Sequence, residues 1–272
     1  CFGGCKKLKT IIFPENSPLQ LIDENAFKDT SIESITIPLQ CQLIGKGAFD
    51  SSRLVSIDIP ANCKLDDCCF INCEKLRNIN ISPDNHHYKF IDNKYLVTKS
   101  NPETEDYDKL VFVVNDQPTL VIPSFIKAFS NKCLNSTKFT TVEFSNDTQI
   151  ESIDQYLFQH SEVETIKIPS CVKRIEKYAF YRCEKLKNII FEPNSKLQII
   201  GENAFHMCHI QSITIPSEVT DIEKDAFSIC ISLTNVTFEP RSKLKLIGES
   251  AFMAARIETI NLPPHLETIG DY

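Results

Sequence analysis

Residues 168–191 read IPSCVKRIEKYAFYRCEKLKNIIF, and this stretch of 24 residues contains the features that recur along the chain. A proline follows an isoleucine, Val172 and Ile175 come next, Ala179-Phe180 lies in the middle, and an alternating apolar segment closes the unit at Phe191. A unit of this length cannot bury its own apolar face, so neighbouring units must stack into one continuous core. The stretch therefore predicts a solenoid.

The same unit recurs at an almost constant interval of mostly 22 to 24 residues. Its last apolar residues are Phe13, Ile37, Ile59, Ile81, Phe144, Ile168, Phe191, Ile215, Phe238 and Leu262. Only the interval from Ile81 to Phe144 breaks the rhythm. Two unit types alternate, so the larger period is 47 residues, from Phe144 to Phe191 to Phe238. A duplicated pair of units is the simplest origin.

Each unit predicts one strand and one tight turn. The Ile-x-Ile segment alternates inward and outward side chains, as a short strand does. Proline lacks an N–H and suits the end of that strand. The segment around Ala179-Phe180 fits a single helical or 3₁₀ turn. We therefore expect an α/β solenoid, with parallel strands on one face and short helical turns on the other.

This pattern resembles the BspA-like class of leucine-rich repeats. The Ala-Phe pair is unchanged at Ala26-Phe27, Ala48-Phe49, Ala179-Phe180, Ala204-Phe205, Ala226-Phe227 and Ala251-Phe252, and its first residue varies at Cys1-Phe2, Cys69-Phe70 and Leu157-Phe158. In one unit Cys133-Leu134 takes this position, and Ala128-Phe129 comes too early. The resemblance implies a right-handed curved solenoid with a concave parallel sheet, as found on exposed adhesive proteins of bacteria and parasitic protists.

We expect residues 1–272 to form a single solenoid fragment with repeats over 1–81 and 122–272. Residues 82–121 carry no repeat anchors and form a β-rich island, in which the runs 88–92, 95–98 and 110–114 predict a small β-meander. Both ends of the chain fall inside repeats, which indicates a piece of a longer protein. The island is either a structural insert or a place for specificity, because binding residues concentrate on long loops.

Composition and motifs exclude several classes of function. The chain has 36 acidic against 29 basic residues, a net charge of -7, which disfavours a surface for nucleic acid. No apolar stretch is long enough to span a bilayer. There is no nucleophile elbow, phosphate loop or H-E-x-x-H motif. Four of the seven glycines follow an isoleucine at a turn, where a side chain would crowd the next unit. We therefore expect neither an enzyme nor a small-molecule cofactor.

Eleven of the twelve cysteines follow the period of the repeat. Cys5, Cys73, Cys183, Cys208 and Cys230 lie three residues after a phenylalanine position; Cys1, Cys69 and Cys133 take the alanine position; Cys41, Cys63 and Cys171 lie in the turn after the strand. Free cysteine behaves as a small buried apolar residue, so buried thiols are expected, with cross-turn disulfides as the alternative. Cys68 and Cys69 cannot both point inward, so one of them is a candidate reactive thiol.

One cluster has the residue types of a metal site. His206, Cys208 and His209 lie near Cys183 and Cys230 of the adjacent units. Zinc requires four convergent ligands. The cysteines belong to the interior and the histidines flank them, so we expect no metal site. The expected core consists of Phe27, Phe49, Phe70, Phe158, Phe180, Phe205, Phe227, Phe252, Cys183, Cys208 and Cys230.

Two outward columns run along the strands. The first is uniformly small and hydrogen-bonding, with Thr10, Ser34, Ser56, Asn78, Thr141, Thr165, Asn188, Ser212, Asn235 and Thr259. We interpret this uniform column as a structural ladder. The second, variable column contains Ile12, Thr36, Asp58, Asn80, Glu143, Lys167, Ile190, Thr214, Thr237 and Asn261, and it is where we expect ligand choice.

These features favour a non-catalytic module that binds a protein or glycan. The candidate residues are Thr36, Asp58, Asn80, Glu143, Lys167, Ile190, Thr214 and Thr237 on the concave face, and Tyr88, Tyr95, Glu103, Glu105, Asp106 and Tyr107 on the island. The leading expectation is adhesion at a cell surface or after secretion. An intracellular scaffold or adaptor in the cytoplasm is the alternative, because unpaired cysteines suit a reducing compartment.

Overall fold

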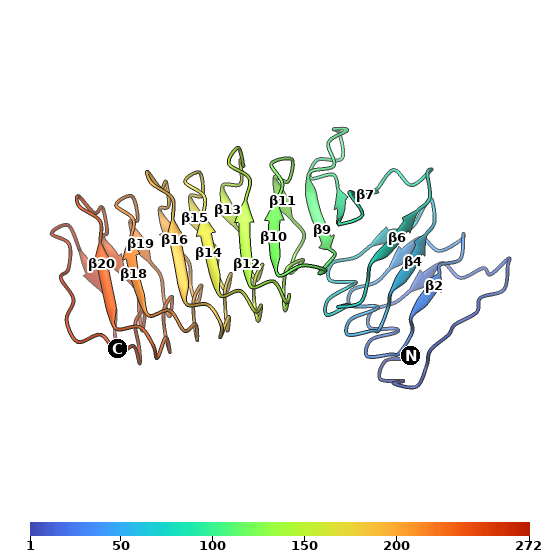
Figure 1. Ribbon diagram of the computed structural model, residues 1–272, viewed down its shortest axis with the longest axis horizontal. Coiled ribbons are helices and arrows are strands. Elements are labelled where there is room, and N and C mark those ends of the chain that lie inside the picture. Colours follow the sequence, from blue (N-terminus) through green and yellow to red (C-terminus); the bar gives the residue numbers. More distant parts are fainter. The chain divides into compact units, whose positions relative to one another are not determined.

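A computed structural model of the protein describes all residues, 1–272. The chain divides into two compact units. Unit 1 comprises residues 1–116 and 128–133, and unit 2 comprises residues 117–127 and 134–272. Each unit is built from stacked coils whose strands pair in parallel with those of the next coil (Figure 1). That residues 1–272 form a single solenoid fragment, interrupted only by the island, stays a prediction.

The longer strands of unit 2 follow the repeat register of the sequence. They are β10 (Thr119–Ile122), β12 (Thr141–Phe144), β14 (Thr165–Ile168), β16 (Asn188–Phe191), β18 (Ser212–Ile215) and β20 (Asn235–Phe238). β10, β12, β14 and β16 form one parallel sheet, and β18 pairs with β20. Within β14 and β16, Ile166 pairs with Ile189 and Ile168 pairs with Phe191. Equivalent positions of successive coils therefore lie side by side.

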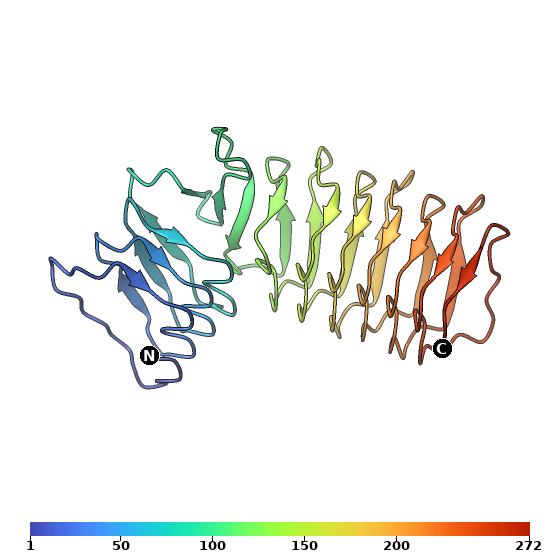
Figure 2. The ribbon, with the colours of Figure 1, turned by 180° about the vertical axis from the view of Figure 1, so that it is seen from behind.

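A second parallel sheet in unit 2 consists entirely of two-residue strands. These are β13 (Ser152–Ile153), β15 (Arg174–Ile175), β17 (Ile199–Ile200), β19 (Asp221–Ile222), β21 (Leu246–Ile247) and β22 (Thr268–Ile269). The sequence did not predict this sheet, because two residues cannot show a period-two alternation. The coils that carry both sheets lie one after another when unit 2 is viewed from behind (Figure 2).

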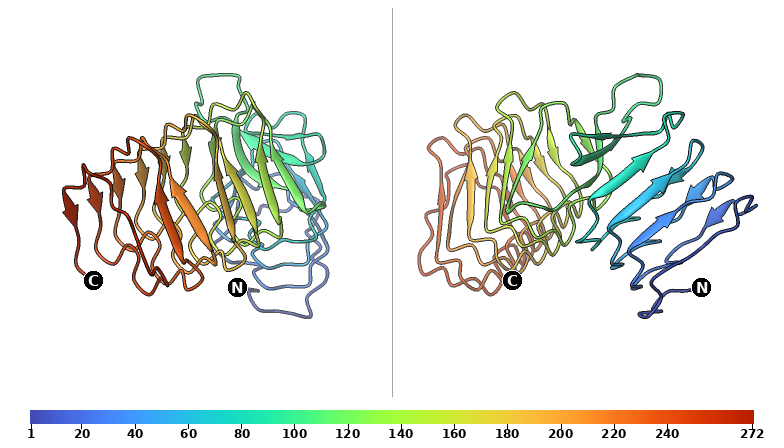
Figure 3. Two further views of the ribbon diagram at one scale, coloured as in Figure 1. Left: turned by 60° about the vertical axis from the view of Figure 1, so that its left-hand side comes forward. Right: turned by 45° about the vertical axis from the view of Figure 1, so that its right-hand side comes forward.

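Unit 1 repeats this arrangement with fewer coils. Its longer strands are β2 (Ser34–Thr36), β4 (Ser56–Ile59) and β6 (Asn78–Ile81), and its short strands are β1 (Leu21–Ile22), β3 (Leu43–Ile44) and β5 (Lys64–Leu65). Both sets pair in parallel, in the orders β2-β4-β6 and β1-β3-β5. The path of the chain around each coil can be followed in Figure 3.

The island forms a β-meander. β7 (Tyr88–Ile91) pairs antiparallel with β8 (Tyr95–Thr98), and β8 pairs antiparallel with β9 (Lys109–Val113). β11 (Ala128–Phe129) joins the same sheet in parallel with β9. Ala128-Phe129 is therefore a strand, and the turn position of that coil belongs to Cys133-Leu134, with Leu134 fully buried. The repeat ladder resumes at β10, inside the range assigned to the island.

The expected helical turns are wrong, because the structure contains no helix. Around each Ala-Phe pair, the residue before the alanine and the residue two after the phenylalanine have positive φ, as Tyr178 (59°) and Arg182 (56°) do. Alternate amides also donate to the next coil: Phe180 N–H bonds to the Ala204 carbonyl at 2.8 Å, whereas Tyr181 N–H bonds to Tyr178. Left-handed residues and hydrogen bonds between coils both prevent a run of helical residues.

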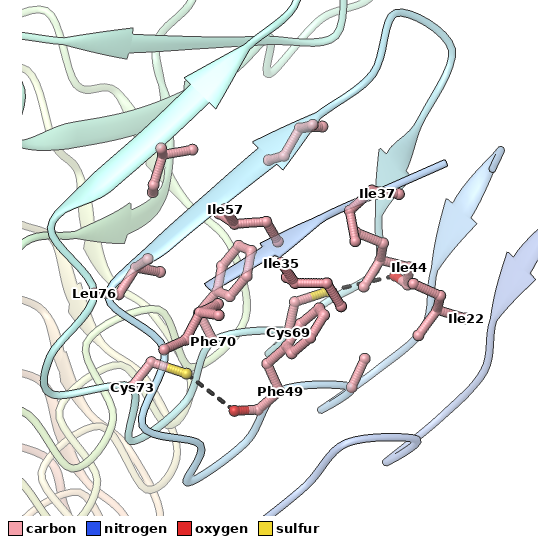
Figure 4. Packing of buried hydrophobic residues seen from close by; sticks show 14 of the residues in the cluster. Ile22, Ile35, Ile37, Ile44, Phe49, Ile57, Cys69, Phe70, Cys73 and Leu76 are labelled. Carbon is pink, nitrogen blue, oxygen red and sulfur yellow. Dashed lines mark hydrogen bonds between the residues drawn. The ribbon is translucent and has the colours of Figure 1, made fainter. Parts of the chain in front are cut away.

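Phenylalanine rings stack between coils through the interior of each unit, and only the end rings, Phe2 and Phe252, are partly exposed. In unit 2, Phe180 lies 5.0 Å from Phe158 and 5.0 Å from Phe205, and the stack continues through Phe227 to Phe252. In unit 1 the stack runs from Phe2 through Phe27 and Phe49 to Phe70. Isoleucines of both sheets surround the rings in unit 1 (Figure 4).

Candidate binding surfaces

The outward side chains of the longer strands form what we call the strand face of each unit. The strands alternate buried and more exposed residues, as in β18, where Ile213 and Ile215 are buried and Ser212 and Thr214 are exposed. This alternation places the members of both outward columns that lie in these strands on the strand face, whereas Thr10, Ile12, Thr259 and Asn261 lie outside any strand. The side chains of these columns are therefore accessible to a partner, except where neighbours bind them.

The uniform column shows the expected bonding between coils at one position. Asn188 Nδ2 donates to Thr165 Oγ1 at 3.3 Å. Asn188 and Thr165 are direct neighbours in the register of β16 and β14. Short polar side chains at adjacent positions thus stabilise the ladder without using the backbone.

Three side chains of the variable column form a network in unit 1. Thr36 Oγ1 donates to Asp58 Oδ2 at 2.8 Å, and Asn80 Nδ2 donates to Asp58 Oδ1 at 2.7 Å. Each carboxylate oxygen of Asp58 is thereby held by a neighbouring coil. Fixed side chains lose less conformational freedom on binding than free ones do, so this network is a preorganised polar surface.

The variable column of unit 2 is chemically mixed. Glu143 and Ile190 are exposed, Lys167 Nζ lies 2.9 Å from Glu192 Oε1, and the hydroxyl oxygens of Thr214 and Thr237 are 2.9 Å apart. Val121 on β10 also belongs to this column and is 41% exposed. Val121 was not predicted as a member of this column, because the sequence places it in the range 82–121 that carries no repeat anchors. A run of exposed aliphatic, acidic, basic and hydroxyl groups can contact a broad macromolecular surface.

The Lys167–Glu192 pair makes stability depend on pH. Hydrogen bonding from Lys167, and then from the Ser170 amide, lowers the pKa of Glu192 below its usual value. A lowered folded-state pKa gives stability that is present above the unfolded pKa and is lost as pH falls through the folded pKa. Glu192→Gln is expected to cost at most about 1 kcal/mol at neutral pH, because the pair is partly exposed.

Urea denaturation at neutral and strongly acidic pH measures this contribution. The cost of Glu192→Gln should vanish in acid, where the carboxyl group is protonated in both states. Glu184→Gln, at an exposed position of the same region, is the control and should change little at either pH. An equal cost at both pH values would show that the ionic interaction does not stabilise the fold.

The candidate residues of the island fall into a buried group and an exposed group. Tyr88 and Tyr95 are each only 7% exposed, and the Tyr88 hydroxyl bonds to both the amide and the carbonyl of Leu65. These two tyrosines therefore pack inside unit 1 and do not present a surface to a partner. Glu103, Glu105 and Asp106 are exposed in the loop between β8 and β9.

Tyr107 holds this loop against the meander. Lys89 Nζ lies 4.2 Å from the centre of the Tyr107 ring and Lys99 Nζ lies 5.3 Å from it. The Tyr107 hydroxyl donates to the His86 carbonyl at 2.9 Å. Glu105 lies 3.1 Å from Lys99. The acidic loop is thus tethered at one end, and its carboxylates remain at the surface.

All twelve cysteines have free thiols, and seven of them are buried. Cys183, Cys208 and Cys230 donate to the carbonyls of Phe158, Phe180 and Phe205 at 2.8, 3.2 and 3.1 Å. In unit 1 the Cys73 thiol does the same toward Phe49 at 3.0 Å (Figure 4). Burial raises the pKa of Cys183 and of Cys230 to about 12. These thiols are therefore protonated at neutral pH, and their side chains pack in the core. Of the pair at 68 and 69, Cys69 is buried and Cys68 is partly exposed.

The histidine and cysteine cluster around residue 206 does not form a metal site. No group of three or more His, Cys, Asp and Glu side chains has an arrangement that could hold a metal ion. His206 stacks on Tyr181 at 5.1 Å, while the Cys208 thiol points toward the Phe180 carbonyl. Burial lowers the pKa of His206. The chain also contains no helix that is long and apolar enough to cross a membrane.

Comparison of the sequence with known families agrees with this architecture. Residues 1–97, 111–161 and 151–272 match the BspA type leucine-rich repeat region, in six copies. The chain belongs to this family. The leucine-rich repeat assignment covers both units and most of the island. No curated protein matches the chain.

Several solved leucine-rich repeat structures share the fold. A protein from Eubacterium ventriosum is 21% identical over 91% of this chain and 65% of its own, with a TM-score of 0.76. A leucine-rich cell surface protein from Faecalibacterium prausnitzii is 24% identical over 88% of this chain and 62% of its own, with a TM-score of 0.59. The pneumococcal vaccine antigen PcpA is 21% identical over 96% of this chain and 68% of its own, with a TM-score of 0.66. This leucine-rich repeat chain spans less than two thirds of the length of the Eubacterium ventriosum and Faecalibacterium prausnitzii proteins.

Proposed function

We propose that this leucine-rich repeat chain is a non-catalytic binding module that recognises a protein or glycan partner at a cell surface or outside the cell. The exposed, chemically mixed column on the strand face of unit 2 carries this proposal. Glu143, Ile190, Thr214 and Thr237 are all exposed in one series of parallel strands. A repeating array of this kind offers an extended surface instead of a pocket for a small molecule.

Two further observations support the proposal. The preorganised Thr36–Asp58–Asn80 network in unit 1 presents fixed polar groups at neighbouring coils. Among structures with this fold, one is described as a cell surface protein and another as a vaccine antigen. The exposed acidic loop at Glu103, Glu105 and Asp106 is a second candidate contact for the same partner.

Binding of the purified chain to arrays of extracellular-matrix proteins and glycans tests the proposal. Thr214→Arg with Thr237→Arg should weaken binding at least about tenfold, because two bulky cations would block the part of the strand face that β18 and β20 form. Gln155→Arg, an exposed substitution in the turn after β13 and outside the longer strands, is the control and should leave binding unchanged. Equal losses in both variants would place the contact elsewhere.

Antibody labelling of intact cells that express the full-length gene tests the location. Signal on unpermeabilised cells is the expected result. Signal that appears only after permeabilisation would contradict the surface assignment and favour the alternative, an intracellular scaffold. The twelve free thiols are the observation that favours that alternative, because a reducing cytosol preserves them.

A further inference from the structure

Cys41 and Cys63 occupy one position in two successive coils of unit 1. The Cys41 amide donates to the Pro38 carbonyl at 2.9 Å, and the Cys63 amide donates to the Pro60 carbonyl at 3.3 Å. In unit 2 this same bond is made by Ile126, Val172, Val219 and Leu266, and the first three are fully buried. Two cysteines therefore replace an inward aliphatic residue in consecutive turns. Both cysteines are likewise fully buried.

The backbones beside the two cysteines are joined directly. Lys64 N–H donates to the Gln42 carbonyl at 2.9 Å, and these residues follow Cys63 and Cys41 in the chain. Neighbouring strands in a parallel sheet lie about 4.8 Å apart. Disulfides join Cα atoms that are about 4.4–6.8 Å apart. Two inward cysteines at this position of adjacent coils therefore meet the requirement for a disulfide without a change in the coil path.

A hydrogen bond between the two thiols perturbs the pKa of both, whereas the thiols of Cys183, Cys208 and Cys230 bond to phenylalanine carbonyls. Hydrogen bonding from Cys63 lowers the pKa of Cys41, and the same bond together with burial raises the pKa of Cys63. Their contacts with backbone carbonyls are long, at 3.5 Å from Cys41 to Leu43 and 3.6 Å from Cys63 to Lys64. The backbone therefore holds these two sulfurs less firmly than it holds the Cys183 sulfur, which lies 2.8 Å from its carbonyl partner.

We propose that Cys41 and Cys63 are a modification site, at which a small-molecule disulfide oxidises the two thiols, while the coils are open during folding or local unfolding, to a disulfide that joins adjacent coils. The Cys41 thiolate attacks one sulfur of the oxidant, the oxidant's S–S bond breaks, and one thiolate leaves. Cys63 gives up its proton and attacks the Cys41 sulfur of the mixed disulfide, so the second thiolate leaves. The protein loses two electrons and two protons, and the oxidant becomes two thiols.

The disulfide would fix the shape of a surface hollow that is lined by the residues on either side of the two cysteines. Leu39, Gln40, Gln42, Leu43, Asn62 and Lys64 line a hollow of about 450 Å³ in unit 1. These residues flank the two cysteines on both coils. A covalent bond between Cys41 and Cys63 therefore sets the spacing of the two turns that form the hollow.

Oxidation in glutathione buffers tests the site. The reduced protein is incubated with oxidised glutathione, both in its native state and during refolding, then alkylated and digested for mass spectrometry. The expected product is about 2 Da lighter before alkylation, because two hydrogens are lost, and it yields a peptide linked through Cys41 and Cys63. The oxidised protein should also melt at a higher temperature than the reduced protein, because the bond closes a loop.

Cys41→Val with Cys63→Val is the matched variant, because Val172 and Val219 show that valine fits this position. It should fold, form no linked peptide and lose the difference in melting temperature between oxidised and reduced protein. Cys183→Ser with Cys208→Ser is the control and should retain the Cys41–Cys63 link. Absence of this link in both native and refolded protein, or links at Cys183, Cys208 and Cys230 instead, would overturn the proposal.

Discussion

Phe205→Ala is expected to lower the free energy of unfolding by about 3–5 kcal/mol, the usual cost of removing a buried aromatic side chain. Phe205 is fully buried and lies between two other rings, 5.0 Å from Phe180 and 5.2 Å from Phe227. The substitution removes the contacts with both neighbours and leaves a cavity at the centre of three coils. Urea denaturation followed by circular dichroism measures the loss.

Two further variants of unit 2 make this result specific. Leu134 occupies the phenylalanine position in another coil and is fully buried, so Phe205→Leu should cost clearly less than Phe205→Ala. Thr214→Ala, at an exposed position, should change stability by no more than about 0.5 kcal/mol. If Thr214→Ala were the more damaging substitution, the assignment of inward and outward residues would be wrong.

Gly201→Ala is expected to cost about 2–3 kcal/mol, because overpacking against rigid neighbours forces the backbone to move. A Cβ atom at Gly201 would lie 2.7 Å from the Ile175 carbonyl oxygen and 2.9 Å from the Lys177 nitrogen, both in the preceding coil. Neither contact can be relieved by turning a side chain. The Gly201 amide also donates to that same carbonyl at 2.8 Å, so the two coils cannot separate without losing a hydrogen bond.

Thermal melts compare Gly201→Ala with Gln198→Ala, an exposed substitution three residues earlier. Only Gly201→Ala should lower the melting temperature strongly. A mild effect would show that adjacent coils adapt to an extra methyl group. The sequence alone predicted this crowding for Gly45, Gly201, Gly248 and Gly270, and at each of them a Cβ would approach backbone of the neighbouring coil within 3 Å.

The repeat period was sufficient to predict the stacked coils and their register. Each Ala-Phe pair recurs at a fixed place, and where the longer strands pair, inward residues lie opposite their equivalents, as Ile166 does to Ile189. The position of Cys133-Leu134 followed from the same spacing, although Ala128-Phe129 has the commoner residues. The meander of the island was also predicted, because its strands are long enough to show their own pattern.

Features that depend on contacts between coils were harder to predict. The helical turns were expected because a short segment around Ala-Phe suits a helix as well as a turn. Tyr178 and Arg182 adopt positive φ because alternate amides bond to the next coil. Tyr88 and Tyr95 were expected to contact a partner because they lie in the island, where binding residues were expected to concentrate, but packing within unit 1 buries them.

The sequence by itself determined the coil, its period and its inward residues, because burial of a repeated apolar pattern has only one arrangement that satisfies every unit at once. Tertiary structure decided which side chains of the strand face bond to each other and which thiols meet. Asp58 is held by Thr36 and Asn80, and Cys41 meets Cys63, through neighbours about one coil away in sequence. Such contacts depend on side-chain orientation and distance between coils, and these become fixed only when the coils stack.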